Sequence, residues 1–182
     1  MKKPRLILTN ILVFVITGLI ATILVPLEAL KNGFDGYEIT ACIVLIYFSG
    51  MSITAGYHRL WSHKAYQANG FVRVVLAIGG AMSLQNSILH WSADHRIHHR
   101  HVDDNDKDPY SAKKGFWYSH LGWMLREYQA HRYGDYSNCR DLQKDKVVMW
   151  QHKHYLTIML SANFGIPLLL GWLNGDIWGM LL

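Results

Sequence analysis

Residues 6–27, LILTNILVFVITGLIATILVPL, decide the fold class of this 182-residue chain. No residue in this stretch carries a charged side chain, and two later stretches, over residues 39–57 and 155–175, share this character. As an α-helix, each stretch is long enough to cross a hydrocarbon core about 30 Å thick. We therefore predict an all-α integral membrane protein with three transmembrane helices, rather than a soluble domain that buries these helices in its core.

The charged residues indicate how these helices are oriented. Fourteen of the eighteen Lys and Arg residues lie between residues 58 and 154 and three lie before residue 6, whereas residues 28–38 contain one Lys and three acidic residues. Because cytoplasmic segments carry the excess of Lys and Arg, we predict that the N-terminus and residues 58–154 are cytoplasmic. The net charge of +5 favours anionic membrane lipids as partners, and without a nucleic-acid-binding motif we expect no nucleic acid.

A fourth apolar segment, residues 71–89, is predicted to form a helix that lies in the membrane interface rather than crossing. Its uninterrupted apolar part, Val74 to Leu84, is too short for a span. Residues 90–154 then form a cytoplasmic, histidine-rich helical cap on the same single domain. Because the sequence after residue 175 opens another apolar segment, we expect the domain to be incomplete at Leu182.

Five of the eleven histidines form two clusters, HRLWSH over residues 58–63 and HRIHH over residues 95–99. Neutral imidazole is the most common metal ligand among side chains, and it suits iron, zinc, copper or nickel. The last three histidines follow i, i+3, i+4 spacing and share one helix face, whereas the first two would lie about 140° apart on a regular α-helix and suit a helix end. The predicted metal ligands are His58, His63, His95, His98 and His99.

Shared metal ligation also constrains the topology. Ligands of one ion lie within a few ångströms of it, so both clusters must be on one side of the membrane, and residues 71–89 cannot cross between them. We predict that Asp94 accepts a hydrogen bond from a ligating ring. Asp104, Asp106 and Asp108 lack the other positions of a calcium loop, so we interpret them as part of a solvated loop.

Three motifs in order, HRLWSH (58–63), WSADHRIHH (91–99) and DPYSAKKGFWYSHLGWML (108–125), resemble the membrane fatty-acyl desaturases of the stearoyl-CoA type. The resemblance covers nearly the whole chain and implies an oxidoreductase with four spans and a di-iron centre. It implies that the five clustered histidines bind two Fe2+ ions, with further ligands from a third histidine box and a fourth span beyond Leu182. It implies no catalytic residue other than the metal ligands.

The same resemblance implies a substrate site. Trp91 matches a tryptophan that lines the bent acyl tunnel of these enzymes. Asn10, Asn86 and Asp94 match residues that contact the CoA or amide portion of the substrate. These four residues are therefore the predicted substrate-binding residues.

The match is incomplete where the family places cations for the CoA phosphates. Ala93 and the pair Glu127-Tyr128 occupy positions at which animal members carry Arg or Lys, and only Arg126 lies nearby in the sequence. With fewer cations for the phosphates, both a fatty acyl-CoA and a lipid-linked acyl chain stay open as substrates.

For the reaction, the resemblance implies that O2 and two electrons from a cytochrome b-type haem protein or a ferredoxin allow the di-iron centre to remove two hydrogens from adjacent methylenes. The protein fixes which carbons react, because methylenes are chemically alike. Two alternatives stay open: a membrane hydroxylase with the same histidine boxes, and a non-catalytic metal-binding membrane fragment. We expect the isolated chain to be inactive, because it offers too few ligands for two well-held ions.

Overall fold

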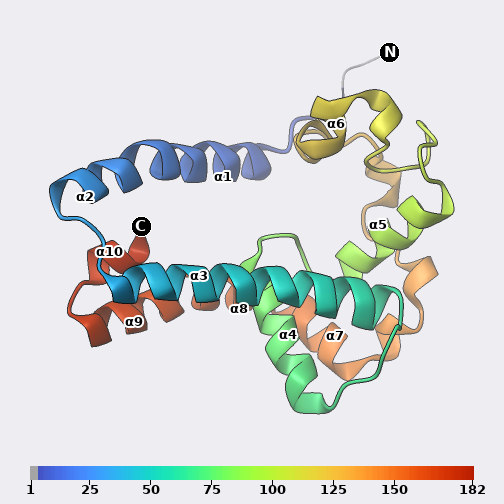
Figure 1. Ribbon diagram of the computed structural model, residues 1–182. Helices are drawn as coiled ribbons and strands as arrows, with labels where there is room; N and C mark the ends of the chain where they lie inside the picture. Colours follow the sequence, from blue (N-terminus) through green and yellow to red (C-terminus); the bar gives the residue numbers. More distant parts are fainter. Residues whose placement is uncertain (1–3) are drawn as a thin grey trace.

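The computed structural model describes residues 4–182, most of which are helical (Figure 1). Among the described residues, three continuous helices are long and apolar enough to cross a membrane, which confirms the predicted all-α membrane fold. They comprise Leu8–Lys31, Gly36–Ser62 and Tyr155–Asn174. An isolated antiparallel bridge between Leu6 and Arg126 joins the segment before the first helix to the cap.

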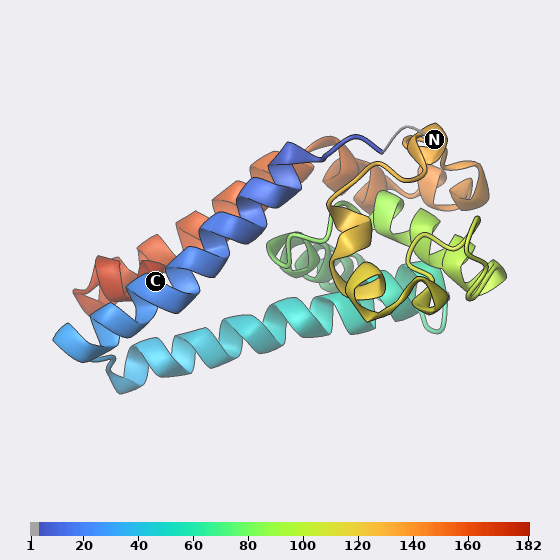
Figure 2. The ribbon, with the colours of Figure 1, turned by 90° about the horizontal axis from the view of Figure 1, so that it is seen from above.

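Each long helix is divided into shorter segments. The first consists of α1 (Leu8–Leu19), η1 (Ile20–Leu24) and α2 (Val25–Lys31), the second of α3 (Gly36–Met51) and η2 (Ser52–Ser62), and the third of α8 (Tyr155–Leu160), η8 (Ser161–Gly165) and α9 (Ile166–Asn174), followed by α10 (Ile177–Leu181). The cap begins before the predicted residue 90, because α4 (Gly70–Met82) packs in it against α7 (Lys146–Lys153). It also contains α5 (Ile88–Arg100) and α6 (Phe116–His120), with single turns η3 (Ala112–Lys114), η4 (Gly122–Met124), η5 (Ala130–Arg132), η6 (Ser137–Cys139) and η7 (Leu142–Lys144). The cap helices gather at one end of the molecule, and the turn between α2 and α3 lies at the other end (Figure 1 and Figure 2).

The second long helix begins at Gly36 rather than at the predicted residue 39, because its start is capped. Asp35 accepts a hydrogen bond from the backbone N–H of Glu38 at 2.9 Å, and Glu38 accepts one from the backbone N–H of Asp35 at 2.9 Å. This reciprocal capping box satisfies two backbone donors that would otherwise have no partner. At its other end the helix continues past residue 57 to Ser62, so His58 belongs to the helix itself.

The helix expected over residues 71–89 is shorter, because α4 ends at Met82. Leu84 and Asn86 then adopt positive φ angles of 60° and 75°, which a helix cannot accommodate. Ser87 starts the next helix by accepting a hydrogen bond from the backbone N–H of His90 at 3.3 Å. The two histidine clusters are therefore separated by a short helix and a tight turn rather than by one long helix.

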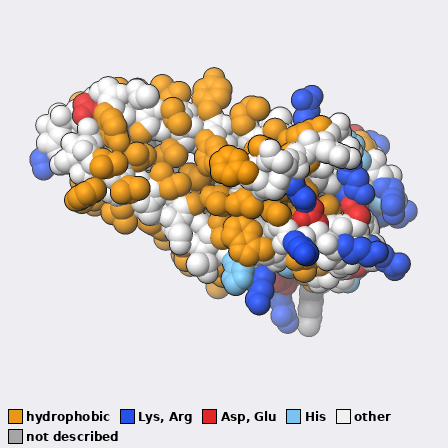
Figure 3. Space-filling view, turned by 90° about the horizontal axis from the view of Figure 1, so that it is seen from below, with side chains coloured by type: hydrophobic (Ala, Val, Ile, Leu, Met, Phe, Trp, Pro, Cys, Tyr) orange, Lys and Arg blue, Asp and Glu red, His pale blue; other side chains and the backbone are white. Residues whose placement is uncertain are grey.

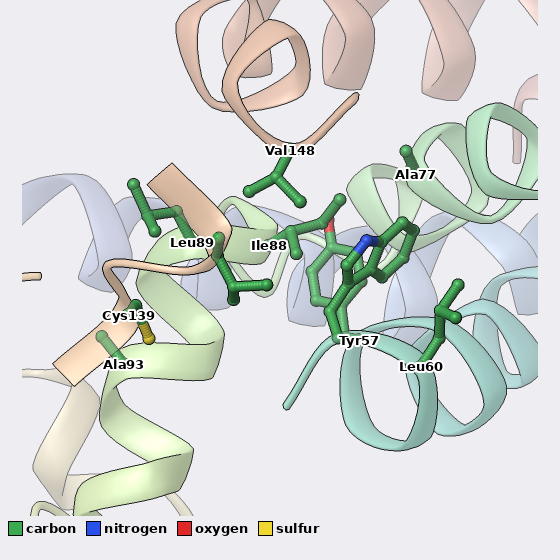
Figure 4. Close-up of a cluster of buried hydrophobic side chains, with 10 residues drawn as sticks. Tyr57, Leu60, Ala77, Ile88, Leu89, Ala93, Cys139 and Val148 are labelled. Carbon is green, nitrogen blue, oxygen red and sulfur yellow. The ribbon is translucent and has the colours of Figure 1, made fainter. Parts of the chain in front are cut away.

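The main hydrophobic core lies in the cap, where η2, α4, α5 and α7 meet (Figure 4). Tyr57, Ile88 and Val148 are fully buried there. The buried Gln151 amide donates to the Tyr57 hydroxyl at 2.6 Å and accepts from the backbone N–H of Ile88 at 3.1 Å. Because a buried amide is costly unless it is hydrogen bonded, this bridge holds α7 against η2 and α5. These two segments carry the histidine clusters.

The long helices expose their apolar side chains instead of burying them. The most apolar stretch of the first helix has 0% of its residues buried, and those of the other two have 11% each. Hydrophobic side chains cover this part of the molecule, whereas Lys and Arg gather at the cap end (Figure 3). Water-exposed proteins seldom carry so large an apolar surface, and lipid is the solvent that suits it.

The contact between α4 and η2 depends on Gly80. A β-carbon at this position would collide with the ring of Tyr57, which is fully buried and hydrogen bonded to Gln151. We predict that Gly80→Ala lowers the free energy of unfolding by about 1–3 kcal/mol, the usual cost of overpacking a core. Thermal unfolding of the detergent-solubilised protein measures the effect as a lower Tm.

Gly50→Ala is the matched control for this substitution. Gly50 is also helical, in α3, but a β-carbon there meets no atom within 4 Å. It should leave the Tm unchanged or raise it slightly, because alanine favours the helix by up to about 1 kcal/mol over glycine. Equal Tm values for the two variants would show that α4 and η2 do not pack as described.

Candidate metal centre

The first histidine cluster lies at a π-helical end of the second long helix. In η2 the backbone N–H groups bond to the carbonyl five residues earlier, and the pattern ends with the His63 N–H donating to the His58 carbonyl at 3.0 Å. Residues five apart therefore lie one above the other, and the rings of His58 and His63 are 4.5 Å apart. The wide angular separation expected on a regular α-helix does not apply here. The five-residue spacing of the two histidines in the sequence matches the five-residue spacing of the hydrogen bonds in η2.

The second cluster meets the first through His95 and His99 of α5. The His95 ring centroid lies 4.7 Å from that of His58, and the His99 centroid lies 4.8 Å from that of His63. The His95 and His99 rings are 4.5 Å from each other, as one-turn spacing on a helix allows. One potential ligand nitrogen from each of these four rings lies within 4.8 Å of all the others. We call this group the four-histidine site.

The geometry of the four-histidine site fits one metal ion. An ion held about 2.1 Å from two nitrogens at a right angle leaves them about 3.0 Å apart, and an opposite pair about 4.2 Å apart. The Nε2 atoms of His63 and His95 are 3.0 Å apart, and all four ligand nitrogens lie within 4.8 Å of one another. Small side-chain movements are enough to close all four nitrogens onto one ion. Four imidazoles suit iron, zinc, copper or nickel.

The site favours the neutral form of its rings. Burial lowers the pKa of His95 to about 3, and the neighbouring His99, His58 and His63 rings contribute to the shift. Burial also lowers the pKa of His63, with contributions from the nearby His58, His99 and Arg96. At pH 7 both rings are therefore neutral, which is the state in which imidazole binds a metal ion.

Residues 38–182 match the sequence model of the family described as fatty acid desaturase. This chain belongs to the fatty acid desaturase family. The match includes both histidine clusters and confirms the resemblance seen in the three motifs.

Three relatives illustrate how far this family match extends. The probable acyl-CoA desaturase of Schizosaccharomyces pombe is 49% identical over 143 residues, which cover 77% of this chain and 29% of the relative. The stearoyl-CoA desaturase of Bos taurus is 42% identical over 73% of this chain and 38% of its own length. The acyl-CoA Delta-9 desaturase of Acheta domesticus is 36% identical over 91% of this chain and 48% of its own length. The chain thus spans less than half the length of these relatives.

In this family member, the fifth clustered histidine lies outside the four-histidine site. The His98 ring is 6.3 Å from that of His95 and 5.5 Å from that of His99. Its Nδ1 lies 2.9 Å from a carboxylate oxygen of Asp108, which is fully buried. Asp108 also accepts hydrogen bonds from the backbone N–H groups of Asp103 and Tyr110, at 2.9 and 3.1 Å. With Nδ1 donating to this carboxylate, Nε2 is the nitrogen of His98 that would be available to a metal ion.

Two predictions about the acidic residues are wrong. Asp108 is buried rather than part of a solvated loop. Hydrogen-bond donors from His98, Asp103 and Tyr110 take the place of water around its carboxylate. Asp94 does not contact a ring of the four-histidine site, because it lies on another side of α5. Its oxygens are 3.5 Å from His90 Nε2 and 3.8 Å from Arg132 Nη2. Asp108 is therefore the residue that orients a clustered histidine.

The structure separates the four predicted substrate residues. The Asn10 side chain donates to the Met124 carbonyl at 2.7 Å, which joins α1 to the cap. Asn86 forms the turn before α5, where its side chain accepts from the Ser87 N–H at 2.8 Å. Trp91 stacks on the ring of His95, with centroids 4.6 Å apart and planes 25° apart. Of the four, Trp91 alone contacts the four-histidine site.

Asp94 borders a small pocket in the cap. The pocket is partly open to solvent, and its cavity volume is about 50 Å³. Two cations, Arg126 and Arg132, line it together with aromatic and polar side chains. Burial raises the pKa of the Asp94 carboxyl, although His90 and Arg132 counteract the shift. The lining also includes Trp123, Tyr128, Gln129 and Tyr133.

Removing one imidazole should weaken metal binding. We predict that His95→Ala lowers Co2+ affinity by more than the roughly 10- to 100-fold typical of losing a residue that merely orients a ligand. His131→Ala is the control, because His131 is exposed and belongs to no group of potential ligands in residues 4–182. Titration with Co2+ followed by visible absorbance measures both. Equal losses in the two variants would contradict the four-histidine site.

The shared site also predicts the topology. Residues 65 and 100 should be labelled from the same side of the membrane, because each closely follows a histidine of the four-histidine site. Residue 32, in the turn after the first long helix, should be labelled from the other side. The test uses Ala65→Cys, Arg100→Cys and Asn32→Cys with a membrane-impermeant thiol reagent. Labelling of residues 65 and 100 from opposite sides would show that the two clusters cannot share an ion.

Proposed function

We propose that this chain carries the metal-binding core of an O2-dependent fatty acyl desaturase, an enzyme that introduces a double bond into a saturated acyl chain. The observation that supports it most is the convergence of four imidazoles from two sequence clusters in a chain of the fatty acid desaturase family. The relatives named acyl-CoA and stearoyl-CoA desaturase indicate the same activity.

The proposed metal is iron. His58, His63, His95 and His99 would hold one ion, and His98, oriented by Asp108, would contribute to a second. Within residues 4–182 the four-histidine site is the one group of three or more potential ligands, so His98 needs partners from elsewhere to hold an ion. When bound, two Fe2+ ions supply the electron transfer to O2 and the oxidation of C–H bonds. The chain's own part is to orient the rings and keep them neutral.

The proposed substrate is a fatty acyl-CoA. Arg126 and Arg132 place two positive charges at the pocket beside Asp94, where a phosphate-bearing head group would bind. These cations offset the missing ones at Ala93 and Glu127. Trp91 precedes Asp94 by three residues on α5, so a head group at the pocket would let the acyl chain pass Trp91 toward His95. An acyl chain carried by a phospholipid would also present a phosphate, so the choice of CoA as the carrier rests on the relatives named acyl-CoA and stearoyl-CoA desaturase.

The proposed location follows from the charge distribution. The N-terminus and the cap, which carries the histidines, would face the cytoplasm, as the excess of Lys and Arg there indicates. The long apolar helices would lie among membrane lipids. A cytochrome b-type haem protein or a ferredoxin would supply the electrons at the cytoplasmic face. A membrane hydroxylase is the second candidate, because the same ligands can serve oxygen insertion.

The test is a chimera in which this chain replaces the aligned part of the Schizosaccharomyces pombe relative. The host is a yeast that lacks its own acyl-CoA desaturase, and its fatty acids are measured by mass spectrometry. We expect acids that have lost two hydrogens, and none from a chimera that also carries His95→Ala. Acids that have gained an oxygen would instead identify a hydroxylase. A chimera that binds iron and gives neither product would support the non-catalytic alternative.

A further inference from the structure

Asp141 lies far from both histidine clusters in the sequence but close to them in space. Its carboxylate accepts hydrogen bonds from Arg96 Nη1 at 2.8 Å and from Arg96 Nη2 at 3.0 Å, and it pairs with Lys64 Nζ at 2.8 Å. Arg96 directly follows His95, and Lys64 directly follows His63. One carboxylate therefore contacts both of the segments that supply the four-histidine site.

The remaining N–H groups of Arg96 bind the end of η2. Nη2 donates to the Trp61 carbonyl at 2.9 Å, and Nε donates to the Ser62 carbonyl at 3.1 Å. These carbonyls lie in the last turn of the helix, where no further turn offers N–H donors. Nη1 also donates to the Asn138 carbonyl at 3.0 Å. Arg96 thus caps the helix that ends at Ser62, directly before His63, while Asp141 holds its guanidinium in place.

The arrangement is rigid for physical reasons. A guanidinium is planar, so a two-point pairing with a carboxylate fixes its orientation as well as its position. The side chains of Arg96 and Asp141 are 20% and 32% exposed, which limits screening by water. Hydrogen bonds from Arg96 and Lys64 hold the pKa of Asp141 well below its usual range, so this carboxylate stays charged at pH 7. Lys64 is 61% exposed and adds less.

We propose that Asp141 and Arg96 are positioning residues of the metal centre, which set the distance between the end of η2 and α5 and thereby hold His63 next to His95. Neither residue offers a ligand to the metal. The inference rests on the proposed function of the four-histidine site. It assigns a role in metal binding to a residue more than forty positions beyond the second cluster.

The test is Co2+ binding to the purified full chain in detergent, followed by visible absorbance. We expect Asp141→Asn to lower Co2+ affinity about 10- to 100-fold and to change the ligand-field spectrum, because the rings no longer meet at the same distance. Arg96→Lys should act in the same way. It keeps a positive charge beside Asp141, but an ammonium group cannot reproduce the planar set of donors that reaches the Trp61 and Ser62 carbonyls.

Asp145→Asn is the matched control. Asp145 pairs with Arg73 and caps α7 through the Val147 and Val148 N–H groups, but it contacts neither cluster. It should lower the Tm and leave the Co2+ affinity and spectrum of the folded protein unchanged. If Asp141→Asn or Arg96→Lys folds and binds Co2+ with wild-type affinity and spectrum, the positioning role is overturned.

The outcome for the unsubstituted protein separates this inference from the proposed function. If the unsubstituted protein binds no Co2+, or if His95→Ala binds it equally well, the four-histidine site is wrong and the inference falls with it. If the unsubstituted protein binds Co2+ and His95→Ala does not, the site stands. The Asp141 and Arg96 variants then decide the inference alone.

Discussion

Four imidazoles that could hold a metal ion converge from two helices, and this convergence constrains the path of the chain from residue 58 to residue 99. Nitrogens of the two clusters must meet within a few ångströms, so the chain has to leave η2 and return to it over the short segment between His63 and His95. The helix α4 and the turn around Asn86 make this return. The fully buried Tyr57 and Ile88, bridged by Gln151, hold the returning segment in place.

The buried side chains lie mainly in the cap, where this constraint acts. The cap encloses the polar and aromatic contacts that need fixed geometry, whereas the long helices leave their apolar surfaces free. In water such surfaces would drive association, but in a bilayer they are already solvated by lipid. The long helices therefore anchor the cap without having to pack tightly against it. The contacts that fix side-chain geometry therefore lie around the histidines, where the second long helix leaves the apolar region.

The sequence predicts the fold class and the convergence of His58, His63, His95 and His99, because these depend on local spacing and on apolar length. It does not predict the π-helical register of η2, since the wide separation expected for His58 and His63 assumes a regular α-helix. The roles of Asp108 and Asp141 are likewise invisible in the sequence. Both carboxylates reach α5 from segments whose position depends on the folding of the whole cap. Contacts between residues far apart in the chain leave no local pattern in the sequence from which they could be predicted.

The separation of His98 from its neighbours follows from helix geometry. On a regular α-helix, positions i and i+4 differ by about 40° in direction, whereas i+3 and i+4 differ by about 100°. His95 and His99 can therefore face one ion together, while His98 points toward a different place and meets the buried Asp108. An HxxHH sequence on one helix thus presents two directions of ligation rather than one. The same helix can serve two ions, which is the arrangement that the proposed di-iron centre requires.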